Sequence, residues 1–488
     1  MRAQALRIAA VAALAVGALV SAAPGGSADP APRAPTDAPL LRSTDPGAER
    51  FRPVGRLKAS SQCTATLVTP PGRPSGAAPE ARALVLTAGH CVGLLPANEV
   101  RIDQDAPRNW TFTPAYFVDT VDQHRSFPVT STRYATMKGV DLAVLELEAT
   151  YADLAVIDVR PMEISAAPPS DDTSIEAVHL PVTGVPSDQQ YLRRSFCRTA
   201  APTDLAEGQW VWRGTSPNDC AGVAGGSSGG LVVQRDGNRV ASVLNTTVET
   251  SVSGVCKVGR PCEIGSGGAV LRPGTSYAIG ASALARCSLD DIGEPSCPLD
   301  PGRGVAPQDG RGAVQSKDAR WDATLNAGGH AYARIKTGPL GRTDCRNPAG
   351  YGPPFAVADR PRVTDPLPSR EDFYVLCAVS GPPWTPSRFA SHATVQVDDT
   401  PPTVDPVVSA RDLGTQWAVE PIYQIYEIVH YEIKYGARAE VDCADPSGYQ
   451  PYRRFPAFLA KTREWRYCAI GHDLAGNTTP PRTVDLTP

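Results

Sequence analysis

Residues 84–91 read Leu-Val-Leu-Thr-Ala-Gly-His-Cys, an apolar run that ends in a small-residue turn carrying His90. Two other segments also place polar or glycine-rich residues directly before a strand-like run. Residues 141–147 read Asp-Leu-Ala-Val-Leu-Glu-Leu, and residues 225–231 read Gly-Gly-Ser-Ser-Gly-Gly-Leu. Short apolar runs bounded by Gly, Pro, Asp and Ser are typical of β-strands joined by turns. We therefore expect these three segments to belong to an all-β fold.

The composition agrees with that expectation and excludes several classes of protein. The chain has 488 residues, so about three domains are expected. It contains 48 Pro, 43 Gly and only 3 Met, which favours many short strands over long helices. With 42% hydrophobic residues, 20% charged residues and a net charge of -4, it resembles neither a disordered nor a multi-span membrane protein. It also lacks the basic surplus that nucleic-acid binding needs.

The N-terminus predicts the compartment. Arg2 and Arg7 precede an apolar run of thirteen residues, 8–20, which the small residues 21–23 follow. This pattern is typical of a cleaved secretory signal. The alternative is a membrane anchor, but the run is shorter than the roughly 20 apolar residues that span a bilayer. We expect a secreted, extracellular protein without a membrane span.

Secretion makes the cysteine pattern informative, because an oxidising compartment lets twelve cysteines pair as six disulfides. Sequence alone leaves the connectivity open, and neighbour pairing is only the simplest arrangement. Zinc binding is disfavoured, since there is no Cys-x2-Cys pair and Cys468 with His472 has no matching pair nearby. We expect no metal and no cofactor. In chain order the neighbouring cysteines are Cys63 and Cys91, Cys197 and Cys220, Cys256 and Cys262, Cys287 and Cys297, Cys345 and Cys377, and Cys443 and Cys468.

Composition shifts divide the chain. A Pro-rich stretch after the signal has too few apolar residues to bury a core and is expected to be a spacer or propeptide. A second turn-rich stretch is expected to separate the large β domain from two smaller modules. The predicted divisions are a signal at 1–23, a spacer at 24–50, a β domain at 51–289, a linker at 290–317 and β-sandwich modules at 318–402 and 403–488.

The two smaller modules form an internal repeat with an offset of 98 residues. Residues 345–353 align without gaps to residues 443–451, and each copy holds two cysteines, which are expected to form an internal disulfide. The joint at 398–402 and the Asp-Leu-Ala-Gly-Asn turn at 473–477 resemble tandem bacterial immunoglobulin-like or fibronectin-like domains. This resemblance covers about a third of the chain and implies β-sandwiches.

The three segments quoted first carry His90, Asp141 and Ser228, separated by 51 and 87 residues. In this order and context they resemble the chymotrypsin-like (trypsin-like) serine peptidases. The match spans about half of the chain and implies a two-barrel β domain. Residues 54–57 and 63–68 are similar to the opening strands of the secreted bacterial branch of that group.

The resemblance also implies a chemistry. A serine hydroxyl is a poor nucleophile at neutral pH, so it needs an imidazole to take its proton and a carboxylate to orient that imidazole. We expect Ser228 to be the nucleophile, His90 the general base and then acid, and Asp141 the orienting carboxylate. The N–H groups of Gly226 and Ser228 would form the oxyanion hole. The resemblance places a Cys63–Cys91 disulfide beside the histidine.

One residue departs from the pattern of the animal digestive members. Ser227 stands where those enzymes carry an aspartate that pairs with a freed N-terminus, so activation by that route is not expected. The pocket floor is expected near 219–222, where Asp219 would either face the pocket or belong to a loop beside Cys220. Its wall is expected near 243–247, with Asn245 in place of a serine. We expect surface or structural roles for the remaining histidines, His124, His179, His330, His392, His430 and His472.

The sequence therefore predicts a secreted serine endopeptidase whose C-terminal modules attach it to a substrate or surface. Its expected partners are a protein or peptide substrate and an extracellular or cell-wall polymer, but neither nucleic acid nor a membrane. The alternative is a catalytically inactive secreted adhesion or binding protein. An intact set of His90, Asp141 and Ser228 argues against that alternative.

Overall fold

The computed structural model describes residues 37–488 apart from residues 74–75, 236, 250–255, 257, 266–267, 295, 303, 308–314, 327–330, 369–371, 382–389 and 423–426. Its regular structure is almost entirely β, which confirms the predicted fold class. The α-helices of the described residues are single turns, α1 (Tyr151–Ala155) and α2 (Ser282–Ala285). None of these described helices is long and apolar enough to cross a bilayer. The expected signal at 1–23 lies outside the described residues.

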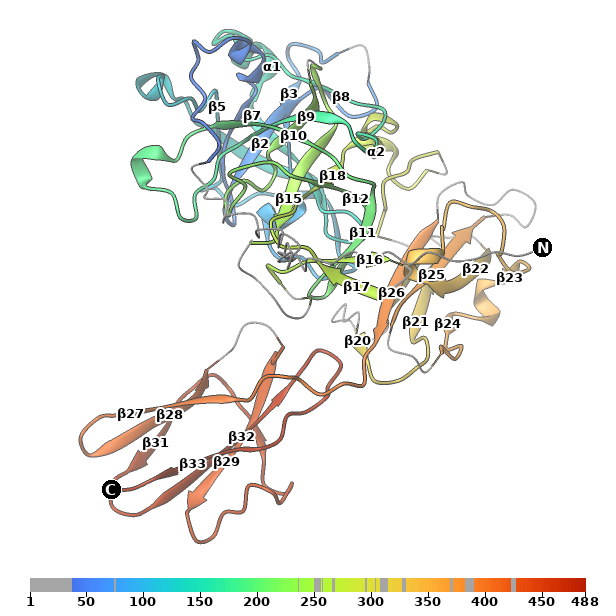
Figure 1. Ribbon diagram of the computed structural model, residues 1–488. Helices are drawn as coiled ribbons and strands as arrows, with labels where there is room; N and C mark the ends of the chain where they lie inside the picture. Colours follow the sequence, from blue (N-terminus) through green and yellow to red (C-terminus); the bar gives the residue numbers. More distant parts are fainter. Residues whose placement is uncertain are drawn as a thin grey trace, which may run out of the picture. The chain divides into compact units, whose positions relative to one another are not determined.

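The first barrel is a closed ring of six antiparallel strands, drawn in blue to cyan in Figure 1. The ring closes because β6 pairs with both β5 and β7. Apolar side chains fill it, among them the fully buried Leu57, Leu67 and Val144. Its strands are β1 (Val54–Lys58), β2 (Gln62–Val68), β3 (Arg82–Thr87), β5 (Thr111–Pro114), β6 (Phe127–Thr136) and β7 (Leu142–Thr150), and β4 (Val100–Asp105) adds to β6.

The second barrel has six strands in the order β10-β9-β13-β15-β18-β12. A bridge between Thr199 and Asn218 brings the ends of β10 and β12 together, next to the Cys197–Cys220 disulfide. Its strands are β9 (Ser174–His179), β10 (Arg193–Arg198), β12 (Trp210–Asn218), β13 (Leu231–Gln234), β15 (Ser242–Thr247) and β18 (Ser276–Gly280). The hairpin extension beyond β12 consists of β11 (Thr203–Glu207), β16 (Cys262–Gly265) and β17 (Gly268–Leu271). One parallel pair stands apart, β8 (Glu163–Ile164) with β14 (Arg239–Val240).

Short 3-10 turns connect these elements. The described ones are η1 (Ala48–Phe51), η2 (Gly89–Val92), η3 (Val121–Gln123), η4 (Ser187–Gln189), η5 (Leu289–Asp291), η6 (Leu340–Arg342) and η7 (Val357–Asp359). The turn that matters for the site is η2, because it follows β3 and carries His90.

The described part of the expected spacer, residues 37–50, packs against the barrels. The N–H of Leu41 donates to the carbonyl of Leu192 at 2.8 Å, and the N–H of Arg194 donates to the carbonyl of Pro39 at 3.2 Å. Leu41 and Ala48 are buried. The few apolar residues in this Pro-rich stretch therefore find a surface to cover, so residues 37–50 are not an open spacer.

The expected linker at 290–317 is also largely packed. Leu299 is buried, the hydroxyl of Tyr134 donates to the carbonyl of Asp300, and the ammonium of Lys138 lies 2.9 Å from the Asp300 carboxylate. Further on, β19 (Gly304–Pro307) pairs with a strand of the first module. That module therefore begins before residue 318, because its first strand lies within the turn-rich stretch.

The first module has two sheets around one core. Trp321 and Leu325 from one sheet and its borders pack with Tyr374 and Leu376 from the other. The first sheet is β19-β21-β24, with β21 (Ala323–Asn326) and β24 (Arg362–Val363). The second sheet has the order β20-β26-β25-β22-β23, with β20 (Gln315–Ser316), β22 (Tyr332–Pro339), β23 (Phe355–Ala356), β25 (Asp372–Ser380) and β26 (Ser391–Val397).

The second module is likewise a sandwich with its own core, in which Val419 and Leu459 pack with Tyr431 and Tyr467. Its first sheet is β27 (Val407–Asp412), β28 (Gln416–Ile422) and β31 (Ala457–Ala460). Its second sheet has the order β30-β29-β32-β33, with β29 (His430–Ala437), β30 (Gln450–Pro451), β32 (Trp465–His472) and β33 (Arg482–Leu486).

The sequence repeat corresponds to a shared substructure. In the first module, the ammonium of Lys336 donates to the carbonyls of Asp344 and Asn347 at 2.7 Å each and lies over the Tyr351 ring. In the second module, Lys434 lies over the Tyr449 ring and donates to carbonyls in the same way. This lysine-tyrosine arrangement explains why both residue types recur at an offset of 98 residues.

All twelve cysteines pair with their neighbours in sequence, which confirms the simplest of the arrangements that the sequence left open. Each module contains one of the disulfides. The six bridges are Cys63–Cys91, Cys197–Cys220, Cys256–Cys262, Cys287–Cys297, Cys345–Cys377 and Cys443–Cys468.

Candidate active site

His90 and Asp141 meet in the first barrel although 51 residues separate them. His90 lies in η2 after β3, and Asp141 directly precedes β7, the strand that pairs with β3. The Nδ1 atom of His90 lies 2.6 Å from Oδ2 of Asp141, and the backbone N–H of His90 donates to Oδ1 at 2.8 Å. Asp141 is completely buried, so its carboxylate fixes both the ring and the backbone of His90.

The glycine before His90 makes this contact sterically feasible. A Cβ atom at Gly89 would lie 2.2 Å from the carbonyl oxygen of Thr136 and 2.8 Å from Oδ1 of Asp141. Both distances are far below a van der Waals contact. Only glycine lets the turn approach the Asp141 loop this closely.

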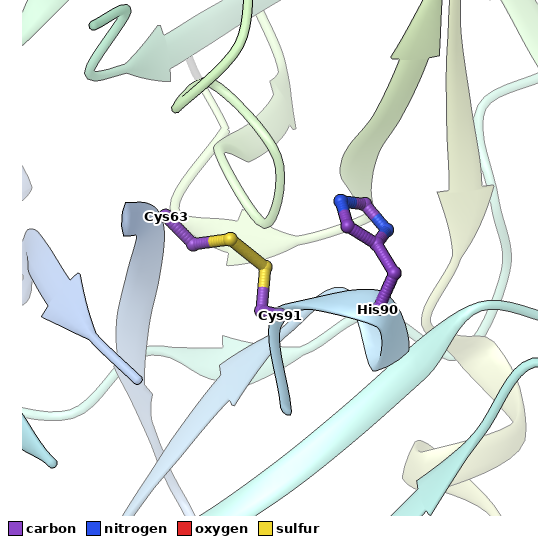
Figure 2. Close-up of side chains that lie close together, drawn as sticks. All are labelled: Cys63, His90 and Cys91. Carbon is purple, nitrogen blue, oxygen red and sulfur yellow. A yellow bond between two sulfur atoms is a disulfide. The ribbon is translucent and has the colours of Figure 1, made fainter. Parts of the chain in front are cut away.

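Figure 2 shows the Cys63–Cys91 disulfide with the His90 ring beside it. The disulfide ties η2 to β2. These three side chains are also the cluster of potential metal ligands that the described residues bring within 4.8 Å of one another. Both sulfurs are consumed by the disulfide, so no thiolate is available and the cluster does not fit a metal ion.

Ser228 lies in the glycine-rich loop before β13, beside the histidine turn. Its carbonyl accepts from the N–H of Thr64 at 2.8 Å and lies 3.9 Å from Sγ of Cys91, the residue after His90. The Ser228 hydroxyl donates to the carbonyl of Asn245 at 3.3 Å, and none of its described contacts is to His90.

The loop around Ser228 depends on a second glycine. Gly229 has φ +77°, and a Cβ there would lie 2.1 Å from the Thr87 hydroxyl and 2.2 Å from the Thr64 carbonyl. The N–H of Gly229 donates to the carbonyl of Leu244 at 2.7 Å. Among the described hydrogen bonds, none uses the N–H of Gly226 or of Ser228 as donor. These two N–H groups, the expected oxyanion-hole donors, thus have no hydrogen-bond acceptor within the part of the chain that the structure describes.

Burial and two carboxylates, those of Asp141 and Glu207, determine the pKa of His90. Burial of the ring lowers the pKa of His90, but the charge and hydrogen bond of Asp141, together with the charge of Glu207, outweigh it. The pKa of His90 is therefore raised above 6.5. A raised pKa makes the imidazole a better proton acceptor and also narrows the pH range in which it is neutral.

Glu207, at the end of β11, is a site residue that the sequence analysis missed. Its side chain is buried and accepts the N–H of Gly259 at 2.6 Å through Oε1. Burial raises its pKa, and the Gly259 N–H and the Thr246 hydroxyl partly oppose that. A single glutamate in a strand carries no motif, so only the fold could place it near His90.

The two expected specificity residues lie in different surroundings. Asp219 is exposed and its Oδ1 accepts the N–H of Arg198 at 2.7 Å, which favours the loop role over the pocket role. Asn245 is buried in β15, and its amide nitrogen and oxygen have no hydrogen-bond partner among the described residues. Its backbone carbonyl is the acceptor for Ser228.

Comparison with solved structures finds likenesses over about half of the chain. The thermostable serine protease AL20 from an extremophilic microorganism is 16% identical with a TM-score of 0.31, and the match covers 48% of this chain and 92% of that chain. Protease Anisep from Arthrobacter nicotinovorans is 16% identical with a TM-score of 0.30, covering 47% and 90%. The scabies mite inactivated protease paralogue S-D1 is 13% identical with a TM-score of 0.32, covering 50% and 91%.

Because the identities and TM-scores are this low, these likenesses carry no argument about the activity of this chain. They include two proteases and one paralogue described as inactivated. No protein-family model and no curated protein matches the chain.

Proposed function

We propose that this protein is a secreted serine endopeptidase of the chymotrypsin-like group that cleaves peptide bonds through an acyl-enzyme. The observation that carries the proposal is the contact between His90 and the fully buried Asp141, formed beside the loop of Ser228. In this proposal, three segments far apart in the sequence supply the nucleophile, the base and the orienting carboxylate. The proposed assignment to the secreted bacterial branch rests on the sequence resemblance alone.

In the proposed reaction, His90 removes the proton of the Ser228 hydroxyl as that oxygen attacks the substrate carbonyl. The new C–O bond makes the carbonyl oxygen an oxyanion, which the N–H groups of Gly226 and Ser228 stabilise. As the oxyanion collapses, the C–N bond breaks, His90 gives the proton to the leaving amine, and the acyl group stays on Ser228. In the second half of the cycle a water molecule, deprotonated by His90, attacks the acyl carbon. The bond from that carbon to the Ser228 oxygen then breaks, His90 returns the proton to the Ser228 oxygen, and the acid is released. Asp141 keeps the imidazole in one orientation throughout.

The Ser228 hydroxyl must move from the Asn245 carbonyl to His90 for this reaction. Its present hydrogen bond is 3.3 Å long and engages a neutral acceptor, so it is weak enough to be exchanged for a bond to the imidazole.

The variant Ser228→Ala tests the proposal. If the three residues act as a unit, turnover of an unfolded protein substrate should fall by roughly 10⁶-fold. Ser242→Ala, which removes another buried serine hydroxyl from the same barrel, is the matched control and should keep parental turnover. Retention of most activity in Ser228→Ala would disprove the assignment.

An extracellular location is part of the proposal. The signal-like residues 1–23 and the six disulfides support it, because disulfides persist in oxidising compartments. Finding the protein in the cell with its cysteines reduced would contradict it. Intact-mass analysis of the culture medium measures both the cleavage of the signal and the number of disulfides.

The two C-terminal sandwiches are proposed to attach the enzyme to a polymeric substrate or to the cell wall. The second module offers the cleaner test, because its core contains only residues after 403. A chain that ends at residue 402 should keep turnover of small peptides and lose binding to insoluble protein or cell-wall material. Equal binding by both chains would remove the attachment role from this module.

The alternative is an inactive secreted adhesion or binding protein. The hydrogen bond of Ser228 to Asn245 instead of His90 is the observation that favours it. An inactive protein would keep this bond when a peptide binds and would not form a covalent adduct with a serine-directed reagent.

A further inference from the structure

His179, the last residue of β9, is completely buried in the second barrel directly behind the Ser228 loop. Its Nδ1 atom lies 2.9 Å from the hydroxyl oxygen of Ser227, which is also completely buried. Ser227 is the residue at which this chain departs from the animal digestive enzymes. The structure therefore puts a histidine opposite the position where those enzymes carry a charged aspartate.

The Ser227 hydroxyl closes a tight turn. It accepts the N–H of Ala224 at 3.1 Å, while the N–H of Ser227 donates to the carbonyl of Ala224 at 2.9 Å. The hydroxyl proton then has His179 Nδ1 as its acceptor. This corresponds to the neutral ring with its proton on Nε2, a buried atom that has no hydrogen-bond partner among the described residues. Burial lowers the pKa of His179 to about 4, with the Ala221 carbonyl raising it and Arg193 lowering it, so the ring is neutral at neutral pH.

The residues after His179 hold the other side of the same loop. The N–H groups of Val182 and Thr183 donate to the carbonyl of Gly225 at 2.7 and 2.9 Å. The hydroxyl of Thr64 accepts the N–H of Leu180 and donates to the carbonyl of Gly226 at 3.0 Å.

These contacts set the direction of the oxyanion-hole donors. In a trans peptide the C=O and the following N–H point in opposite directions. Because the Gly225 carbonyl is bound by Val182 and Thr183, the N–H of Gly226 points away from them. The Ser227 carbonyl accepts the N–H of Gly230 at 2.9 Å, which likewise fixes the direction of the Ser228 N–H.

We infer that His179 is a positioning residue that, through Ser227, holds the 224–228 loop with the N–H groups of Gly226 and Ser228 aimed at the reacting carbonyl. This inference rests on the proposed function. In this chain the neutral hydrogen bond between Ser227 and His179 stands where the animal digestive enzymes pair an aspartate with a freed N-terminal amine. The loop therefore needs no cleavage of the chain to assemble.

Four variants test the inference, with kcat and KM measured separately on a fluorogenic peptide. His179→Leu and Ser227→Ala both remove the hydrogen bond. We expect each to lower kcat by about 10- to 100-fold, part of the effect of losing an oxyanion donor, with KM within about threefold of the parent. His179→Asn should stay within about threefold of parental kcat, because the Asn oxygen can accept the same proton. Ser242→Ala, a buried serine whose hydroxyl has no described partner, is the control and should match the parent.

Hydrogen exchange provides a readout that does not depend on activity. The amides of Ala224 and Ser227 should exchange at least about tenfold faster in His179→Leu and Ser227→Ala than in the parent, since loss of the hydroxyl contact opens the turn. His179→Asn and Ser242→Ala should keep parental exchange at these two amides. If His179→Leu fails to fold, the amide of residue 227 in Ser227→Ala decides, because its bond to the Ala224 carbonyl does not use the hydroxyl, whereas the Ala224 amide loses its own acceptor in that variant.

The outcomes separate the two proposals. Parental kcat and parental exchange in a folded Ser227→Ala would overturn the positioning role while leaving the peptidase intact. A parent that never turns over substrate would overturn the proposed function, and exchange at Ala224 and Ser227 would then decide whether the His179 contact holds the loop. A loss of kcat in His179→Asn equal to that in His179→Leu would also contradict the inference. The Asn oxygen can still accept the Ser227 hydroxyl proton, so kcat should be close to that of the parent.

Discussion

The Nδ1 atom of His90 lies 2.6 Å from the Oδ2 atom of Asp141, and the Asp141 side chain has no exposed surface. The same carboxylate accepts the backbone N–H of His90 through its other oxygen. Both carboxylate oxygens of Asp141 thus bind His90. This arrangement leaves the opposite nitrogen, Nε2, as the atom that can serve as a base.

Asp141→Asn should lower kcat by roughly 10⁴-fold without unfolding the protein, because an amide of the same shape no longer enforces the correct tautomer of His90. Turnover of a fluorogenic peptide and the melting temperature, measured on the same preparation, check both parts. A loss of less than about tenfold would mean that Asp141 does not orient a working base.

The pH dependence of kcat/KM should have an acidic limb above pH 6.5, because the pKa of His90 is raised and the base acts only when neutral. Glu207→Gln removes one of the negative charges that raise this pKa, so the limb should move to lower pH. Glu263→Gln, a change of a carboxylate in the neighbouring strand β16, is the control and should leave the limb in place. An upward movement in Glu207→Gln would contradict the electrostatic account.

The stability of the fold should decrease as the pH falls from 6.5 to about 4. The pKa of His179 is 6.5 when unfolded and about 4 when buried, so the unfolded chain binds more protons in this range. The free energy of unfolding should drop by about 3 kcal/mol from this group alone. Urea unfolding at several pH values should show a shallower decrease for His179→Asn than for the parent. Equal slopes would mean that His179 is not buried in its neutral form.

Gly229→Ala should abolish activity and destabilise the second barrel. The added Cβ would lie 2.1 Å from the Thr87 hydroxyl and 2.2 Å from the Thr64 carbonyl, and the residue has φ +77°. Gly265→Ala is the matched control, because a Cβ there meets nothing within 4 Å. Thermal unfolding and peptide turnover of both variants check the prediction. A stable and active Gly229→Ala would show that the loop tolerates a different course.

The sequence predicted the β class, and it singled out the two segments whose His90 and Asp141 side chains lie in contact, because each of these leaves a local pattern. Apolar runs between turn residues indicate strands, and Thr-Ala-Gly-His-Cys or Gly-Gly-Ser-Ser-Gly-Gly constrain the backbone through their glycines. The disulfide pairing became definite only in three dimensions, since sequence leaves many connectivities open.

Glu207 and His179 could not be predicted as site residues, because neither belongs to a local pattern. Their roles depend on which strands lie side by side: β11 brings Glu207 toward His90, and β9 brings His179 behind Ser227. The packing of residues in the segments 37–50 and 290–317 could not be predicted for a related reason. A Pro-rich composition indicates that a segment forms little regular structure, but it does not indicate whether a neighbouring surface will cover it.

The most direct test of the proposed peptidase is intact-mass analysis of the purified secreted protein after treatment with a fluorophosphonate, in parallel with Ser228→Ala. The proposal predicts one covalent adduct on the parent and none on the variant, because only a serine activated by His90 attacks the reagent. A folded parent without an adduct, or an adduct that persists in Ser228→Ala, would contradict it.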